Sequence, residues 1–383
     1  MGDNNMIESV RFKNFKSFAV ETLIDFKPSK VEYLESTNIY KGLLKGCSFY
    51  GSNASGKTNA LNAITLLWDF LFGNGTINQN LFTKFNNEKK MWFEYNFIID
   101  ESKIKYEIEF NRDSKVTSEK LFLDGKTLLN RTITSAKSYI TENQDYEDID
   151  SYSLFLRSIY FNTRFNGFPK LKKWFEFLQK SLYFNPQRAI AQIVSFDPKI
   201  NQDIYLETYL EKYGDKEIND FLKKAGFNYR IKYEKRNPLQ MVPFSGRLFI
   251  LRDNLTPIPF FLESQGNVIL FSFLPSYLTI IKNGGILAID EFSSGLHNDL
   301  EEYLVKYFFE NSKEAQIIFV SHSTSILKTS IIRPDQVYAV DFVDNSSRLS
   351  KFSSRGMRES QNMEKMYLSG VFGGIPQYED NTK

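Results

Sequence analysis

The stretch FYGSNASGKTNALNAI, residues 49–64, contains the spacing G-x-x-x-x-G-K-[ST], which is typical of a phosphate-binding loop. Its glycines allow the backbone to curl so that successive N–H groups converge on phosphate oxygens. The lysine of this pattern lies near the β- and γ-phosphates, and the Ser or Thr after it supplies a hydroxyl to Mg²⁺. The predicted phosphate-binding residues are Gly51, Ser52, Asn53, Ala54, Ser55, Gly56, Lys57 and Thr58.

Both flanks of this loop fit a strand–loop–helix unit. GCSFY (46–50) is a short apolar run that predicts a buried strand. In residues 58–72 the apolar side chains recur at helical spacing, at Ala60, Leu61, Ile64, Leu67, Trp68 and Leu71. The N-terminus of that helix would face the anion with the positive end of its dipole. A chance Gly- and Ser-rich turn is the alternative, and the two flanks argue against it.

A second predicted strand ends in the acidic residues that such a loop needs. GGILAIDEFSSGLH (284–297) contains the apolar run 286–289, followed by Asp290 and Glu291. In a nucleotide site the first acid holds Mg²⁺, usually through water, and the second polarises the attacking water. A strand that simply ends in two solvated acids is the alternative. We predict that Asp290 and Thr58 are the metal ligands and that Glu291 is catalytic.

A third apolar strand, within AQIIFVSHS (315–323), ends in Ser321 and His322. The chain has only two histidines, His297 and His322, and each follows one of these strands. Because ligands of open parallel α/β sheets bind beyond the carboxyl ends of the strands, His322 is placed to reach a γ-phosphate. We predict that His322 and Lys57 are catalytic. A capping or packing role is the alternative for His322 and the favoured role for His297.

Length, net charge and cysteine content narrow the classes of protein to which the chain could belong. The chain has 383 residues and a net charge of +2, which does not indicate a nucleic-acid binder. KLKKW (170–174) and RIKYEKR (230–236) are candidate DNA contacts, although short basic runs are usually solvated faces. The single cysteine, Cys47, cannot form an internal disulfide, and there is no signal-peptide or membrane-spanning pattern. We expect a cytoplasmic protein that does not contact membranes.

The long interval between Lys57 and Asp290 predicts an insertion. Alternating apolar residues predict strands at 92–99 and 103–110, joined by a turn, and a hairpin at 121–129 with Asp-Gly at its turn. These strands would form an antiparallel β lobe.

Helical spacing follows at 171–184 and 203–226, and again at 267–281, where Pro275 is expected to disturb the helix. Heptads are not sustained over three or four repeats, so a long coiled-coil arm is not expected. A compact helical insert fits better.

The order of these motifs resembles the ABC-class ATPase heads of SMC proteins, DNA-repair ATPases and the OLD-like ATPases of prokaryotic phage defence. NFKSF (14–18) resembles part of the first strand pair of those heads, and FFLESQG (260–266) lies where their signature lies. RPDQVYAVDF (333–342) and ESQNMEKMYLSGVFGGIPQ (359–377) resemble the C-terminal part of abortive-infection-type AAA ATPases. The resemblance covers both ends and the motif core.

The resemblance implies an α/β P-loop NTPase, an ABC-ATPase head with an antiparallel β lobe and a helical insertion. Its parts would be an N-terminal lobe (1–135), a mainly helical insert (136–245) and a C-terminal lobe (246–383). It also implies ATP and Mg²⁺ as cofactors, hydrolysis with Glu291 as the base, and His322 as the switch histidine.

The same resemblance assigns residues to contacts between two heads. Ser264 and Gly266 would touch the γ-phosphate bound to the opposite subunit, and 294–297 would communicate across the dimer. The signature is shortened to SQG here, and Ser264 is equally a good helix N-cap. A glutamine that links Mg²⁺ to the insert is expected in this class, but neither Gln187 nor Gln192 is assigned to it.

The resemblance favours an ATP-dependent homodimer, or a higher oligomer, that acts as a switch in phage defence. About 60 residues follow His322, so we expect the controlled effector, such as a nuclease, to be a separately encoded protein. A DNA-repair or DNA-maintenance ATPase that binds DNA directly is the alternative. A scaffold that holds ATP without hydrolysis is disfavoured by the acid pair, and a transporter ATPase by the short signature.

Overall fold

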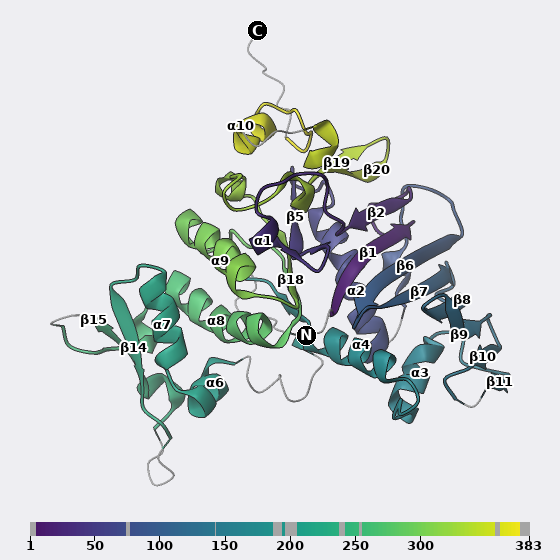
Figure 1. Cartoon of the computed structure of the whole chain (residues 1–383), viewed down its shortest axis with the longest axis horizontal. Coiled ribbons are helices and arrows are strands. Elements are labelled where there is room, and N and C mark those ends of the chain that lie inside the picture. Colours follow the sequence, from purple (N-terminus) through teal and green to yellow (C-terminus); the bar gives the residue numbers. More distant parts are fainter. Residues whose placement is uncertain are drawn as a thin grey trace.

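Two large sheets and a three-stranded sheet form the framework of the described residues (Figure 1), and β3 (Ile39–Tyr40) and β4 (Leu43–Leu44) form a separate two-stranded sheet. Figure 1 shows the eight-stranded sheet and the three-stranded sheet toward opposite ends of the long axis, with the seven-stranded sheet between them. The computed structural model describes residues 5–73, 77–141, 143–186, 194–195, 205–236, 242–252, 255–356 and 361–375.

The seven-stranded sheet joins the strands that carry the sequence motifs. Its order is β13-β12-β17-β18-β5-β19-β20, in which β12, β17, β18, β5 and β19 run parallel and the two edge strands run antiparallel to their neighbours. The strands are β5 (Gly46–Gly51), β12 (Leu182–Phe184), β13 (Val194–Ser195), β17 (Gly285–Ile289), β18 (Ala315–Val320), β19 (Val337–Val343) and β20 (Ser346–Lys351). The predicted strands at 46–50 and 286–289, and the one within 315–323, are confirmed.

The eight-stranded sheet is antiparallel, with the order β11-β10-β9-β8-β7-β6-β1-β2. Its strands are β1 (Asn5–Lys13), β2 (Thr22–Asp25), β6 (Lys90–Ile99), β7 (Ser102–Asn111), β8 (Val116–Leu123), β9 (Lys126–Arg131), β10 (Ala136–Ser138) and β11 (Gln144–Tyr146). Buried and half-exposed side chains alternate along β6 and β7, as the sequence predicts. Asp124 and Gly125, with φ of 49° and 80°, form the predicted hairpin turn.

Helices cover both faces of the seven-stranded sheet. The helices are α1 (Glu35–Asn38), α2 (Lys57–Phe72), α3 (Phe155–Asn162), α4 (Pro169–Lys180), α6 (Leu206–Tyr213), α7 (Lys216–Lys224), α8 (Gln265–Asn283), α9 (Asn298–Asn311) and α10 (Met363–Leu368). One hydrophobic core joins α2 and α4 to the eight-stranded sheet and to one face of the seven-stranded sheet. The other face packs against α6, α7, α8 and α9 in a second core. Alternate residues of the buried parallel strands therefore belong to different cores.

The three-stranded sheet consists of β14 (Tyr229–Tyr233), β15 (Leu248–Arg252) and β16 (Ile258–Pro259). Figure 1 shows α6 and α7 beside it. The helical stretch predicted at 203–226 is two helices, because Gly214 adopts a φ of 71° and ends α6. The helix predicted at 267–281 is confirmed as α8, which continues through Pro275. With 19 residues α8 is the longest helix of the described parts of the chain, where no long coiled-coil arm occurs.

The predicted helix at 171–184 is wrong at its end. The helix α4 stops at Lys180, and Leu182–Phe184 forms β12, which pairs in parallel with β17. Pairing with a buried strand satisfies the backbone groups of these three residues, and a run this short has no periodicity that separates strand from helix. The segment 136–245 therefore contributes the strand β12 to the seven-stranded sheet and is not wholly an insert. The three-part division of the chain stays a prediction.

Candidate nucleotide-binding site

The phosphate-binding motif forms a tight loop between β5 and α2. Gly56 caps α2 with a φ of 113°, and Ala54 also has a positive φ of 62°. A Cβ atom at Gly51 would lie 2.4 Å from the Val340 carbonyl oxygen, so neighbouring backbone excludes every larger residue there. The segment from Gly51 to Thr58 thus has the strand–loop–helix context that an anion site requires.

Serine side chains from distant segments hold this loop. The Ser347 hydroxyl, on β20, donates to the Ser55 carbonyl oxygen at 2.6 Å and lies 2.7 Å from the Ser17 hydroxyl, with which it forms a second hydrogen bond. A Cβ atom at Gly56 would lie 2.3 Å from the Ser347 hydroxyl oxygen. Asn59, in the first turn of α2, donates to the Ser17 hydroxyl as well. The sequence does not predict this clamp, because it joins residues about 300 positions apart.

The ammonium group of Lys57 lies at the mouth of the loop. It donates to the carbonyl oxygens of Gly51 and Ser52, at 3.0 Å and 2.9 Å. Burial lowers the pKa of Lys57, and the nearby carboxylates of Glu291 and Asp290 oppose that shift. Ser52 and Asn53 complete the loop, and Asn53 lines, together with Lys57 and Glu291, a cavity of about 290 Å³. The cavity therefore joins the loop to the acidic strand end.

The two predicted metal ligands are in direct contact. The Thr58 hydroxyl donates to Asp290 Oδ1 at 3.0 Å, across 232 residues of sequence. Asp290 Oδ2 also accepts from the Tyr183 hydroxyl and the Asn185 amide, at 3.2 Å and 3.4 Å. The described residues contain no group of three or more His, Cys, Asp or Glu that could hold a metal ion. One carboxylate and one hydroxyl fit Mg²⁺, which binds proteins through few side chains and completes its shell with water and substrate phosphates.

Glu291 and His322 face each other beside this contact. The His322 Nε2 atom lies 3.6 Å from Glu291 Oε2, and the His322 backbone N–H donates to the Ser293 hydroxyl. Burial and Lys57 lower the pKa of His322, against the opposing charges of Glu291 and Asp290, so the imidazole is neutral at pH 7. Glu291 has a φ of 56°, a strained backbone for a non-glycine residue and of a kind that clusters at functional sites.

Ser264 and Gly266 lie in a different cavity, of about 360 Å³, together with His297 and Gly295. Ser264 is the N-cap of α8, and its hydroxyl accepts from the Asn267 backbone N–H at 3.4 Å. Ser264 is therefore a helix N-cap, which was one of its two predicted roles. Ser264 is also exposed, and it lies at the N-terminus of a 19-residue helix, where the helix dipole is positive. His297 caps α9. Within one chain, this cavity and the one at Lys57 share no lining residue.

Lys16 is a further cation at the site that sequence reasoning missed. It lies within NFKSF at a φ of 48°, and its backbone N–H donates to the Leu81 carbonyl oxygen at 2.7 Å. Burial lowers the pKa of Lys16, and the carboxylate of Asp290 opposes the shift, so the two groups are near enough for their charges to interact. The sequence could have indicated Lys16, because it is the central residue of the motif NFKSF (14–18). Gln187 and Gln192 lie outside the described residues.

A family model described as "AAA domain, putative AbiEii toxin, Type IV TA system" matches residues 48–328, which is more than half of the chain. The chain belongs to this AAA-domain family. The match begins within β5 and ends beyond His322, so it contains the loop, the acid pair and the histidine. Family and fold together support a nucleotide-binding ATPase.

Solved structures of Smc heads share the fold of this family member. An Smc head bound to the C-winged helix domain of ScpA is 17% identical, covers 90% of this chain and 97% of its own, and has a TM-score of 0.55. An Smc head with an extended coiled coil, bound to the C-terminal domain of ScpA from Pyrococcus furiosus, is 15% identical, covers 91% and 96%, and has a TM-score of 0.51. The predicted ABC-ATPase head is thereby confirmed as a fold. No curated protein matches the sequence.

A buried carboxyl group lies behind the histidine loop of this AAA-domain protein. Glu301, in the first turn of α9, has no exposed surface. The Tyr50 hydroxyl, near the end of β5, is buried as well. Burial raises the pKa of Glu301 to about 7, with a further increase from Glu302, while the Ser323 hydroxyl opposes the shift.

Glu301→Gln is expected to stabilise the protein at high pH. The folded state holds this proton more tightly than the unfolded chain, whose pKa is 4.5, so the stability of the wild type falls as the pH rises through about 7. A shift of this size corresponds to about 3 kcal/mol at most. The free energy of unfolding, measured with urea at pH 5 and pH 8, should be similar for both proteins at pH 5 and higher for the variant at pH 8. A difference that is the same at both pH values would contradict the assignment.

Proposed function

We propose that this protein is an ATP-hydrolysing switch that dimerises with ATP and controls a separately encoded effector, such as a nuclease, in prokaryotic phage defence. The observation that carries the ATPase part is the Thr58–Asp290 contact of 3.0 Å, with Glu291 and His322 beside it. In this arrangement the phosphate loop, the two candidate metal ligands and the candidate base lie together at the carboxyl ends of neighbouring parallel strands.

In this proposal each side chain acts at a stated place. Lys57 and the loop N–H groups bind the β- and γ-phosphates, and Thr58 and Asp290 would hold Mg²⁺. Bound Mg²⁺ would supply positive charge against the phosphates. Glu291 accepts the proton of the attacking water, and neutral His322, with Nε2 3.6 Å from Glu291 Oε2, offers that water a second hydrogen-bond partner. Glu291, whose φ is positive, lines the cavity that also contains Lys57 and Thr58.

Dimerisation is supported by the separation of the two cavities. Ser264 and Gly266 line the cavity at α8 and do not line the one at Lys57, so the γ-phosphate contact that the resemblance implies for them would be made with a second copy of the chain. Large apolar side chains beside Ser264 are exposed, with Phe261 at 63% and Leu262 at 65%. Such a surface favours burial against another protein. The geometry therefore favours two heads that complete each other's sites.

The defence role rests on the family. Its description names an AbiEii toxin and a Type IV toxin–antitoxin system, and the Smc heads of the same fold bind domains of ScpA. By analogy, we propose that this chain also binds a second protein and that its nucleotide state controls that protein. Cytoplasmic localisation stays a prediction; no helix in the described parts of the chain is long and apolar enough to span a bilayer.

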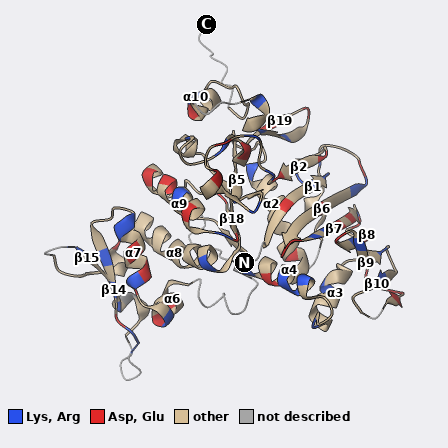
Figure 2. Cartoon of the chain, viewed as in Figure 1, with Lys and Arg blue, Asp and Glu red and all other residues tan. Residues whose placement is uncertain are grey.

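Direct DNA binding, the alternative, has less support from the surface. In the run 170–174, Lys170 and Lys173 both pair with Asp100, and in the run 230–236 Lys232 pairs with Glu234. Figure 2 shows acidic and basic residues interspersed along the helices. Partly neutralised lysines attract phosphates weakly. Salt-dependent binding of DNA by the isolated protein would nevertheless favour this alternative.

The test is the response of the wild-type protein to Mg·ATP. A ligand at about 100 times its Kd stabilises a protein by about 2.7 kcal/mol, so Tm should rise by a few degrees. Size-exclusion chromatography with light scattering should show a larger mass with ATP than without, and a phosphate-release assay should detect turnover. An unchanged Tm would overturn the ATPase proposal, and binding without phosphate release would favour the scaffold alternative.

A further inference from the structure

The C-terminal segment, which we define as residues 361–375, contacts the nucleotide site although it lies outside the ATPase motifs. It contains α10, a turn at Gly370, and the pair Gly373–Gly374. Figure 1 shows α10 above the seven-stranded sheet, next to β19 and β20. The family match ends at residue 328, so nothing in it assigns a role to this segment.

One contact reaches the first residue of the phosphate loop. A Cβ atom at Gly374 would lie 3.3 Å from Gly51 Cα and 3.4 Å from the Tyr50 carbonyl oxygen, so the backbone at Gly374 runs close beside the start of the phosphate loop. The Gly374 backbone N–H donates to Asp341 Oδ1 at 2.6 Å, and the Tyr367 hydroxyl donates to the Gly374 carbonyl oxygen at 3.2 Å. Gly374 is buried and is held from three sides against the start of the loop.

Another contact reaches the loop that carries the histidine. The Thr324 hydroxyl donates to Glu364 Oε1 at 2.6 Å, and Thr324 lies two residues after His322. Glu364 is in the first turn of α10, so the helix and the histidine loop are joined by a charge-assisted hydrogen bond. The histidine loop is therefore tied to the C-terminal segment by a direct side-chain contact.

Aromatic packing fixes the segment between these two contacts. The rings of Phe352 and Phe372 stack with centroids 3.8 Å apart, and Tyr367 meets Tyr50 edge to face at 5.8 Å. Phe372 and Tyr367 are buried in the core that also contains β5, β18 and β19. The C-terminal segment is thus packed into the core, and it contacts the phosphate loop near Gly51 and the histidine loop at Thr324.

We propose that the C-terminal segment positions the nucleotide site, setting Gly51 for phosphate binding through Gly374 and the histidine loop for hydrolysis through Glu364. The inference rests on the proposed function, because it needs ATP in the loop at Gly51–Thr58. It follows that the segment also responds to nucleotide. A γ-phosphate that orders the phosphate loop and the histidine loop orders the segment that both of them touch.

The variants Gly374→Ala and Thr324→Val test the two contacts separately, and Gly370→Ala is the matched control for the first. Gly374→Ala places a methyl group against Gly51 at a φ of 77°, and Gly370→Ala imposes the same backbone strain at a φ of 81° with no atom within 4 Å. We expect Gly374→Ala to raise the KM for ATP on the order of tenfold with kcat little changed, and Gly370→Ala to leave both unchanged. Thr324→Val, which removes the hydroxyl, should lower kcat several-fold at constant KM.

The outcomes distinguish this inference from the proposed function. If the wild type hydrolyses ATP and Gly374→Ala behaves like Gly370→Ala, the inference is overturned and the proposed function stands. If Mg·ATP has no effect on the wild type, the proposed function fails and the inference fails with it. Should Gly374→Ala not fold, amide hydrogen exchange of the wild type decides. Peptides within 361–375 should exchange several-fold more slowly with Mg·ATP than without, and equal exchange overturns the inference.

Discussion

Glu291→Gln is expected to lower kcat for ATP hydrolysis by about 10²- to 10³-fold, within the range that a general base contributes. The amide keeps the size of the side chain but cannot accept the proton of the attacking water. Binding should survive, because no atom of Lys57, Thr58 or Asp290 is changed. The protein should therefore accumulate with ATP bound, as a dimer of stable mass in size-exclusion chromatography. Phosphate release and mass with Mg·ATP are the two measurements.

Lys57→Ala is the matched control for that experiment. It removes the ammonium group at the mouth of the loop, so ATP should cause neither the rise in Tm nor the change in mass. The pair of variants then separates binding from hydrolysis. A mass for Glu291→Gln that ATP leaves unchanged would argue against the two-headed arrangement. Wild-type turnover by Glu291→Gln would remove Glu291 from the reaction.

The sequence predicts the central part of the site well because its signals are local. The loop 51–58 is defined by glycines at fixed spacing, and its flanking strand and helix follow from short apolar patterns. Parallel strands place their carboxyl ends at one edge, so Asp290 and His322 could be assigned to the same edge as Lys57. The structure has all three there, with Glu291 3.6 Å from His322.

Other parts of the site lack a local signal. Tyr183 and Asn185 reach Asp290 only because 182–184 forms a strand, and helical spacing in the preceding residues hides that strand. Ser347 clamps the loop from a distant edge strand, and a lone serine has no recognisable pattern. The burial of Glu301 is likewise set by the packing of α9 on the sheet, whereas its sequence context suggests an exposed acidic helix face.

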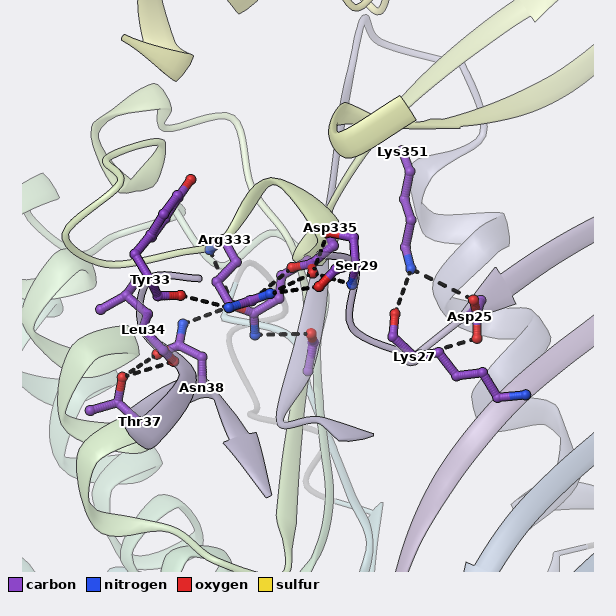
Figure 3. A network of polar contacts seen from close by, with 12 residues as sticks. Asp25, Lys27, Ser29, Tyr33, Leu34, Thr37, Asn38, Arg333, Asp335 and Lys351 are labelled. Atoms are coloured by element: carbon purple, nitrogen blue, oxygen red, sulfur yellow. Dashed lines mark hydrogen bonds and ion pairs between the residues drawn. The ribbon is translucent and has the colours of Figure 1, made fainter. Parts of the chain in front are cut away.

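RPDQ (333–336) lies beyond the family match, and its side chains form a buried polar network in the structure. Arg333 and Asp335 are both fully buried and form a two-pronged ion pair, with contacts of 3.0 Å and 2.8 Å. Figure 3 shows the pair joined to the segment at Ser29–Tyr33, and Lys351 nearby with Asp25. Asp335 Oδ2 accepts from both the backbone and the hydroxyl of Ser29. This network fixes the start of β19, the strand that lies beside β5 and the phosphate loop.

Asp335→Ala is expected to lower the free energy of unfolding by about 3–5 kcal/mol, because it leaves the guanidinium group of Arg333 buried without its partner. The double variant Arg333→Met/Asp335→Leu should lose much less, since no unpaired charge stays in the interior. Asp220→Ala is the control: it breaks an exposed pair with Lys216 and should leave the stability nearly unchanged. Urea unfolding of the four proteins measures this. Equal losses for Asp335→Ala and the double variant would show that packing, and not the stranded charge, sets the stability of this network.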